Sequence, residues 1–186
     1  QFGLVGSEMC IRDRIKAIEV TTHESAIRII SKVGDLNNPA DRDHCLQYMI
    51  AVGLIYGELK AEHYEDDFAC NSVIDQLREK MVIYEDKRYS SEYHEADKRS
   101  IANKLQVFFE DGTSTDPVEV EYPIGHKRRR EEGIPILENK FKSNLNEIYD
   151  SQRSDEIYLK LTDYASLIKM SVPDFQDLLF VKDNSF

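Results

Sequence analysis

The pattern of apolar, β-branched and polar positions predicts strands between residues 15 and 122. Residues 15–22, "IKAIEVTT", are rich in β-branched side chains, which is typical of a strand. Apolar side chains alternate with polar ones over 105–109 and again over 118–122, on either side of an Asp-Gly turn. This pattern predicts a β-hairpin with a loop longer than two residues. A further strand is predicted over 81–86, "MVIYED".

Apolar residues at helical spacing predict three helices in the same part of the chain. The first covers 23–34 and ends near Gly34, the second covers 40–57, and the third covers 65–81. The polar, tyrosine-rich stretch over 86–100 is predicted to be an exposed connection.

The second of these helices has clear start and stop signals. Asn38 can cap it, and Pro39 takes the first helical position, where a missing N–H costs nothing. Gly57 is a typical stop. Beyond its first turns the helix is apolar on every side, so it is predicted to be buried.

The pattern becomes helical after Gly125. Pro135 stands near the start of one predicted helix, and Ser154 and Ser171 can cap two more. The apolar stripe of the first helix consists of Leu137, Phe141, Leu145 and Ile148. The predicted fold class is α+β, with a mixed sheet of three or more strands and helices over 15–125 and a helical segment over 126–186.

The first fourteen residues lack a helical or strand period. Their peptide "LVGSEMCIRDR" resembles the translation of a transposon adapter used in preparing sequencing libraries. We therefore expect residues 1–14 to be a non-native tail, with a genuine N-terminal tail as the alternative. If the tail is non-native, the rest is expected to be the C-terminal part of a longer protein.

Charge and cysteine usage narrow the function classes. The formal net charge of −11 argues against broad binding to nucleic acid or to an anionic membrane. No apolar run approaches the ~18 residues that span a bilayer. Outside the tail only Cys45 and Cys70 remain, which fits a reducing, cytoplasmic compartment and not a disulfide framework or an iron–sulfur cluster. The histidines show no zinc spacing, so no metal site is predicted.

His44 and Tyr48 are the first candidate functional residues. Four residues apart in a helix, they would share one face near its N-terminal end. A polar pair carried into the interior there could form one wall of a site for an acidic ligand. The alternative is that both side chains make ordinary structural hydrogen bonds.

The basic cluster over 125–133, "GHKRRREEG", allows three interpretations. It could be a nucleic-acid patch, which the acidic whole disfavours. It could be a solvated loop whose positive charge is balanced by Glu131 and Glu132. It could also offer cations to a polycarboxylate, because an arginine fork binds carboxylates in bidentate fashion.

Three long blocks of the chain stand out, "NPADRDHCLQYMIAVGLIYGEL", "DKRSIANKLQVFFEDGT" and "VEYPIGHKRRREEGIPILENKFKSNL". They resemble the PrpD branch of the MmgE/PrpD family. The resemblance implies an all-helical domain and a smaller α+β lid, with the active site between them. It assigns 15–125 to the lid and 126–186 to the helical domain, most of which would precede this chain.

The resemblance also implies an activity and a set of site residues. The family member would be a hydro-lyase without a cofactor that converts 2-methylcitrate to 2-methylaconitate. The full-length protein would be a homodimer. Tyr48 matches a lid tyrosine of the active site, with His44 as a second catalytic candidate chosen from its predicted position. His126 and Arg128 become candidates for binding a small tricarboxylate substrate.

Two other functions stay open on the sequence. The same fold could decarboxylate cis-aconitate, a reaction that Tyr48 would also serve. The chain could instead be a non-catalytic acidic interaction module whose basic loop docks a partner.

Overall fold

The computed structural model describes residues 14–181, and its contacts divide the chain into two units between Pro123 and Ile124. We call residues 14–123 unit 1 and residues 124–181 unit 2. Of the tail predicted over 1–14, all but Arg14 lies outside the described residues. The predicted α+β class is confirmed. The assignment of the units to two domains of a longer enzyme stays a prediction.

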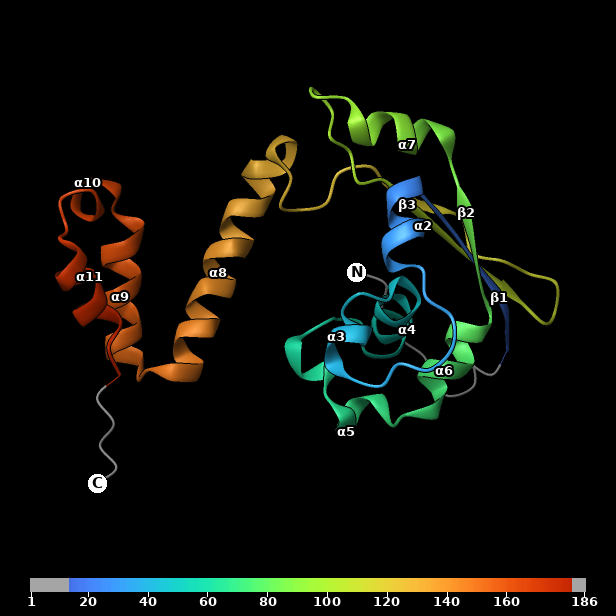
Figure 1. Cartoon of the computed structure of the whole chain (residues 1–186), viewed down its shortest axis with the longest axis horizontal. Coiled ribbons are helices and arrows are strands. Elements are labelled where there is room, and N and C mark those ends of the chain that lie inside the picture. Colours follow the sequence, from blue (N-terminus) through green and yellow to red (C-terminus); the bar gives the residue numbers. More distant parts are fainter. Residues whose placement is uncertain (1–13, 182–186) are drawn as a thin grey trace. The chain divides into compact units, whose positions relative to one another are not determined.

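Unit 1 is built on a four-stranded mixed sheet with the strand order β2-β1-β3-β4 (Figure 1). Its strands are β1 (Ile15–Thr22), β2 (Met81–Glu85), β3 (Asn103–Phe109) and β4 (Val118–Val120). β1 pairs in parallel with β2 and antiparallel with β3, and β3 pairs antiparallel with β4. The predicted strands and the hairpin are therefore confirmed.

Helices connect and cover these strands. They are α2 (Glu24–Ile30), α3 (Pro39–Arg42), α4 (Leu46–Tyr56), the 3₁₀ helix η1 (Ala61–Tyr64), α5 (Asp66–Ala69), α6 (Ser72–Glu79) and α7 (Lys87–His94). The elements from α2 to α6 form the crossover that the parallel pair of β1 and β2 requires.

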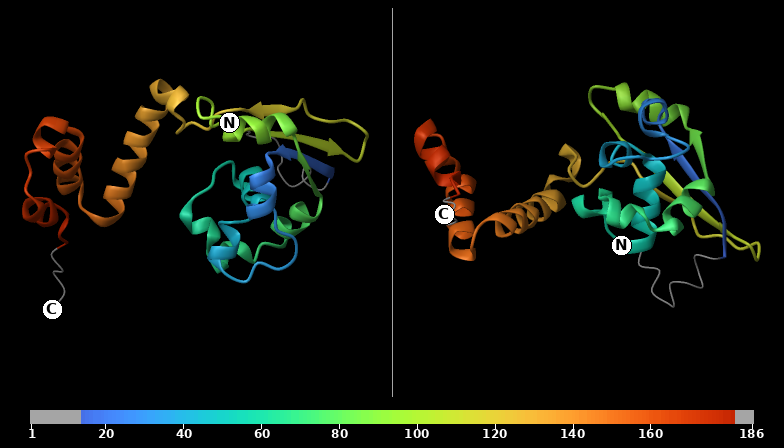
Figure 2. Two further views of the ribbon diagram at one scale, coloured as in Figure 1. Left: turned by 45° about the horizontal axis from the view of Figure 1, so that its top comes forward. Right: turned by 60° about the horizontal axis from the view of Figure 1, so that its bottom comes forward.

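One core joins the sheet to α4 and α6. α4 packs against α6, and both lie on the same side of the sheet (Figure 2). Their buried side chains meet those of β1 and β3 in one cluster that includes Ile18, Val20, Ala51, Val52, Ile74, Leu77 and Val107. As predicted, α4 is largely buried and stops at Gly57, whose φ of 73° is left-handed and suits a glycine.

The single helix predicted over 40–57 is wrong. α3 ends at Arg42, the chain turns through Asp43 and His44, and α4 begins after Cys45, whose backbone is extended. Asn38 caps α3 as predicted, since its side chain accepts a hydrogen bond from the Asp41 N–H at 2.9 Å. The break is accompanied by contacts of Arg42 with residues more than twenty positions away, described below, which the periodicity within 40–57 cannot show.

The exposed connection predicted over 86–100 is also wrong in part. Its first half is α7, capped by Asp86, whose carboxylate accepts from the Arg88 N–H at 2.8 Å. Tyr89 is fully buried and Glu92 is nearly so. Because only one or two side chains of this polar helix face inward, its apolar period is too weak to recognise.

Two further helix boundaries differ from the prediction. α2 ends at Ile30 and not near Gly34. The helix predicted over 65–81 divides into α5 and α6, because the Asn71 side chain accepts from the Val73 N–H at 3.1 Å and starts a new helix.

Unit 2 consists of helices. They are η2 (Lys127–Arg129), α8 (Arg130–Ile148), α9 (Ser151–Thr162), α10 (Tyr164–Leu167) and α11 (Val172–Leu179). Ser171 caps α11 as predicted, but α9 is capped by Asp150, and Ser154 is buried inside that helix. A small core joins α8, α9 and α11 through Leu145, Ile157 and Leu178. No helix among the described residues is long and apolar enough to cross a membrane.

Candidate active site around Tyr48

Tyr48 lies in the first turn of α4, inside unit 1. It is only 2% exposed, and its hydroxyl donates a hydrogen bond of 2.6 Å to the carbonyl oxygen of His63. Burial raises the pKa of Tyr48, while the nearby charge of Arg42 acts in the opposite direction. The phenol therefore keeps its proton at neutral pH and acts as a hydrogen-bond donor.

Arg42, the last residue of α3, holds the same segment from a second side. Its side chain is 7% exposed. Nη1 donates to the carbonyl oxygen of Tyr64 at 2.6 Å, and Nη2 donates to Asp66 at 2.7 Å. A buried guanidinium requires such partners. Two consecutive carbonyl groups, those of His63 and Tyr64, thus bind a phenol and a guanidinium.

Aromatic packing holds η1, whose carbonyl groups accept hydrogen bonds from Tyr48 and Arg42. His63 is buried, and its Nδ1 accepts from the Lys60 N–H at 3.0 Å. The ring stacks on Tyr56 with 5.0 Å between centroids and meets the edge of Phe68 at 4.9 Å. The backbone that Tyr48 contacts is consequently held by its own side chains.

Tyr48 and Arg42 line one surface hollow of about 330 Å³. The other lining residues are Asp35, Leu36, Asp66, Ala69, Cys70 and Asp75. Asp75 forms an ion pair with Arg78. Three carboxylates line the hollow, and Arg42 is the one cation among its described lining residues and so the group that can attract an anion. Tyr48 offers a phenol O–H.

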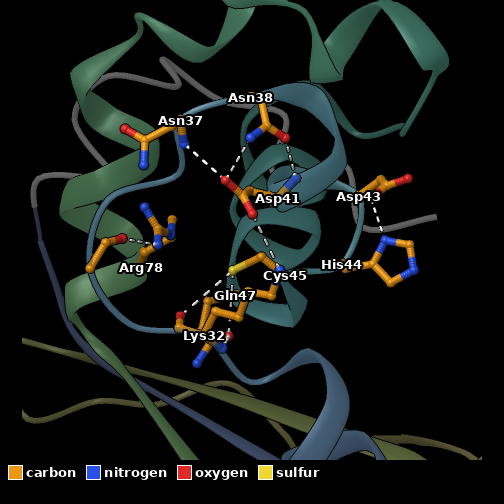
Figure 3. A network of polar contacts seen from close by, with 10 residues as sticks. Lys32, Asn37, Asn38, Asp41, Asp43, His44, Cys45, Gln47 and Arg78 are labelled. Carbon is orange, nitrogen blue, oxygen red and sulfur yellow. Dashed lines mark hydrogen bonds and ion pairs between the residues drawn. The ribbon is translucent and has the colours of Figure 1, made fainter.

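His44 does not share the face of Tyr48, so that part of the prediction is wrong. It lies in the turn between α3 and α4, where its side chain is 61% exposed and pairs with the Asp43 carboxylate (Figure 3). The figure shows both side chains turned away from Cys45 and Gln47. The break after Arg42 changes the direction of His44 relative to α4. The catalytic role of His44 stays a prediction, but the shared helix face with Tyr48 that suggested it is absent.

His126 and Arg128 lie at the start of unit 2. His126 caps η2, because its Nδ1 accepts from the Arg128 N–H at 3.2 Å. Within the same basic cluster, Arg129 pairs with Glu132 at 2.8 Å. Unit 1 and unit 2 are not placed relative to one another, so the substrate-binding role of His126 and Arg128 stays a prediction.

Sequence reasoning missed Arg42 and His63. A charged residue in "PADR", directly before an otherwise apolar helix, was a usable signal for Arg42, because a charge there must find a partner when the helix is buried. No pattern in the sequence pointed to His63.

Of the two cysteines among the described residues, Cys70 lines the hollow and Cys45 does not. Cys45 is buried, and its Sγ contacts the carbonyl oxygen of Lys32 at 3.6 Å, whereas Cys70 is exposed. Over residues 14–181, no group of three or more His, Cys, Asp or Glu side chains is arranged to hold a metal ion.

Comparison with known proteins finds a family match over most of the chain. The profile of the MmgE/PrpD C-terminal domain matches residues 6–163. The chain is 47% identical to 2-methylcitrate dehydratase from Escherichia coli K12 over 167 residues, which cover 90% of this chain and 35% of that protein.

Relatives from other organisms give the same result. The identity is 49% over 164 residues to 2-methylcitrate dehydratase of Cupriavidus necator, covering 88% of this chain and 34% of the relative. It is 46% over 171 residues to the mitochondrial 2-methylcitrate dehydratase of Yarrowia lipolytica, covering 92% and 32%. The chain spans about a third of the length of these relatives and belongs to the MmgE/PrpD family, of which it carries the C-terminal domain.

Proposed function

We propose that this chain is the C-terminal part of a 2-methylcitrate dehydratase, a hydro-lyase that converts 2-methylcitrate to 2-methylaconitate and water in propionate catabolism. The observation that carries the proposal is the identity of 47% and 49% to two such enzymes over about nine tenths of the chain. The whole protein would supply the activity, since the chain covers only a third of those relatives.

The reaction requires three groups. A base removes the proton from the carbon next to a carboxylate, an acid protonates the leaving hydroxyl as a carbon–carbon double bond forms, and donors hold the carboxylates. Tyr48 suits a hydrogen-bond donor to the leaving hydroxyl or the acid, because its phenol lines the hollow and carries a proton at neutral pH. Burial raises the pKa of Tyr48, which favours the role of hydrogen-bond donor. The base would come from the remainder of the protein.

The other site residues and the assembly complete the proposal. His126 and Arg128 would bind substrate carboxylates, and His44 would have a supporting role at most, since its side chain points to solvent. We also propose that the full-length protein is a cytoplasmic homodimer. Light scattering after gel filtration tests the dimer, and a monomeric full-length protein would contradict it.

Tyr48→Phe in the full-length protein is the first test. We expect turnover of 2-methylcitrate to fall about 100-fold or more, because a positioned general acid contributes that much. Tyr64→Phe is the control, since this neighbouring ring stacks on Tyr48 but its hydroxyl has no role in the proposal. Far-UV circular dichroism verifies that both variants keep their fold.

Three outcomes would contradict the proposal. Loss of carbon dioxide from cis-aconitate, without dehydration of 2-methylcitrate, would favour the decarboxylase. A wild-type protein inactive on both substrates would favour the interaction module. Ordinary dehydratase turnover by this 186-residue chain alone would show that the remainder of the protein is not needed.

A further inference from the structure

We propose that Arg42 is a substrate-binding residue that takes a carboxylate beside Tyr48, and that Asp66 occupies its place until substrate arrives. The inference rests on the proposed function, because it assigns the substrate of that same site. It names a residue on the lid side that would hold the polyanion, where sequence reasoning had named only Tyr48 and His44.

One edge of the Arg42 guanidinium has two nitrogens that can bind a carboxylate, and only one of them has a hydrogen-bond partner among the described residues. Nε and Nη2 project their hydrogens from the same edge of an arginine, which is the edge that binds a carboxylate in bidentate fashion. Nη2 already donates to one oxygen of Asp66. Nε is buried and has no hydrogen-bond partner among residues 14–181. A substrate carboxylate that places one oxygen at Nε and the other at Nη2 would satisfy both nitrogens. Asp66 accepts a hydrogen bond from Nη2 alone.

The two partners differ strongly in their burial. The Asp66 side chain is 82% exposed, whereas that of Arg42 is 7% exposed. Asp66 can move into water when another carboxylate takes its place, because its side chain is already solvated and the buried guanidinium then keeps an anionic partner. Arg42 cannot follow it, because Nη1 is anchored on the Tyr64 carbonyl. An incoming carboxylate would therefore find the arginine in place.

The position of Arg42 connects this fork to the chemistry. Arg42 and Tyr48 line the same hollow and bind adjacent carbonyl groups of η1. A polycarboxylate bound at Arg42 would therefore bring its remaining atoms to Tyr48. Departure of Asp66 would also remove one of the negative charges that line the hollow.

Arg78 shows which of these features is particular to Arg42. It is nearly as buried, with 9% of its side chain exposed; it pairs with Asp75; and its Nε also has no hydrogen-bond partner among the described residues. Its Nη2, however, donates to the backbone carbonyl of Gly34 at 2.7 Å. A backbone carbonyl in that place cannot swing away as an exposed side chain can. Arg78 is also not among the residues that line the hollow of Tyr48.

The test compares Arg42→Lys, Arg78→Lys and Asp66→Ala in the full-length protein. Lysine keeps the charge but loses the fork, so we expect Arg42→Lys to raise KM for 2-methylcitrate about tenfold, with a smaller change in kcat. Arg78→Lys should leave KM unchanged. Asp66→Ala removes the competing carboxylate and should lower KM about two- to fivefold.

A second readout separates this inference from the proposed function. Calorimetry with citrate as the probe measures binding without turnover, and melting temperatures identify variants that fail to fold. If Arg42→Lys fails to fold, Asp66→Ala decides, because the side chain that it truncates is exposed and Nη1 of Arg42 keeps its hydrogen bond to the Tyr64 carbonyl.

The outcomes are distinct. Equal KM values in the two lysine variants, or a higher KM in Asp66→Ala, would overturn the role of Arg42 while leaving the dehydratase intact. A wild-type protein without turnover would refute the proposed function, and citrate binding that depends on Arg42 but not on Arg78 would still support the carboxylate site. Citrate binding indifferent to Arg42 would then overturn this inference as well.

Discussion

Unit 1 and unit 2 bury their apolar side chains to very different degrees. In unit 1 a continuous core joins β1 and β3 to α4 and α6. Among residues 124–181 only three apolar side chains are buried, those of Leu145, Ile157 and Leu178. Many large apolar side chains of unit 2 are at least half exposed, among them Ile136, Leu137, Ile148, Leu159, Ile168 and Val172.

This difference shows that amphipathic helices can form without burying their apolar side chains among themselves. The helices of unit 2 carry more apolar surface than they cover among themselves, and exposed patches of this kind mark surfaces that interact with another part or partner. That agrees with a chain spanning a third of its relatives. We therefore expect unit 1 to be the more stable of the two.

Truncation of one buried isoleucine in each unit gives the largest expected effect. Ile18→Ala should lower the free energy of unfolding of unit 1 by about 3 kcal/mol, because its neighbours enclose the cavity that remains. Ile157→Ala, at equal burial in unit 2, should cost less, because the small cluster around it can collapse. Hydrogen exchange in increasing urea measures both units in one chain. Equal losses in the two units would contradict the comparison.

Two helical glycines give the next effect. A Cβ at Gly133 in unit 2 would lie 2.3 Å from the carbonyl oxygen of Ile124, so Gly133→Ala should destabilise the start of α8 by about 2 kcal/mol. Gly53 in α4 has no atom within 4 Å of such a Cβ, so Gly53→Ala should stabilise unit 1 by about 0.5 kcal/mol. Urea unfolding followed by circular dichroism measures both. If Gly133→Ala leaves the free energy of unfolding unchanged, the backbone at Ile124 moves to make room for the Cβ, and the prediction is wrong.

The smallest effect is a pH dependence in unit 1. Burial, and then the charge of His94, lowers the pKa of His23, whose Nδ1 accepts from the Ala26 N–H. Below about pH 6.5 the unfolded chain takes up a proton that the folded chain resists, so stability falls as pH falls. We expect a loss below about 1 kcal/mol between pH 7 and pH 5.

His23→Asn keeps a capping side chain without an imidazole and should remove that loss. Thermal unfolding at pH 7, 6 and 5 provides the measurement. A wild-type stability that rises toward pH 5, or a variant that keeps the full pH dependence, would refute the assignment to His23.

The strands and the main buried helix were predictable because their signals are local. β1 follows from its β-branched side chains, the hairpin of β3 and β4 follows from alternation, and the burial of α4 follows from its apolar surface. α7 was missed because its inward face is formed by few residues, of which Tyr89 is the one fully buried. For unit 2 the sequence predicted helices but not the extent of their exposure, since amphipathic spacing does not state what covers the apolar side.

The sequence by itself determined the α+β class, the family likeness and the burial of Tyr48. The tertiary structure alone decided that Arg42 lies beside Tyr48 and that His44 does not. The reason is that Arg42 is fixed by Tyr64 and Asp66, which lie 22 and 24 residues further along the chain. These contacts accompany a turn at Asp43 and His44 that separates α3 from α4, and the periodicity within 40–57 does not show that turn.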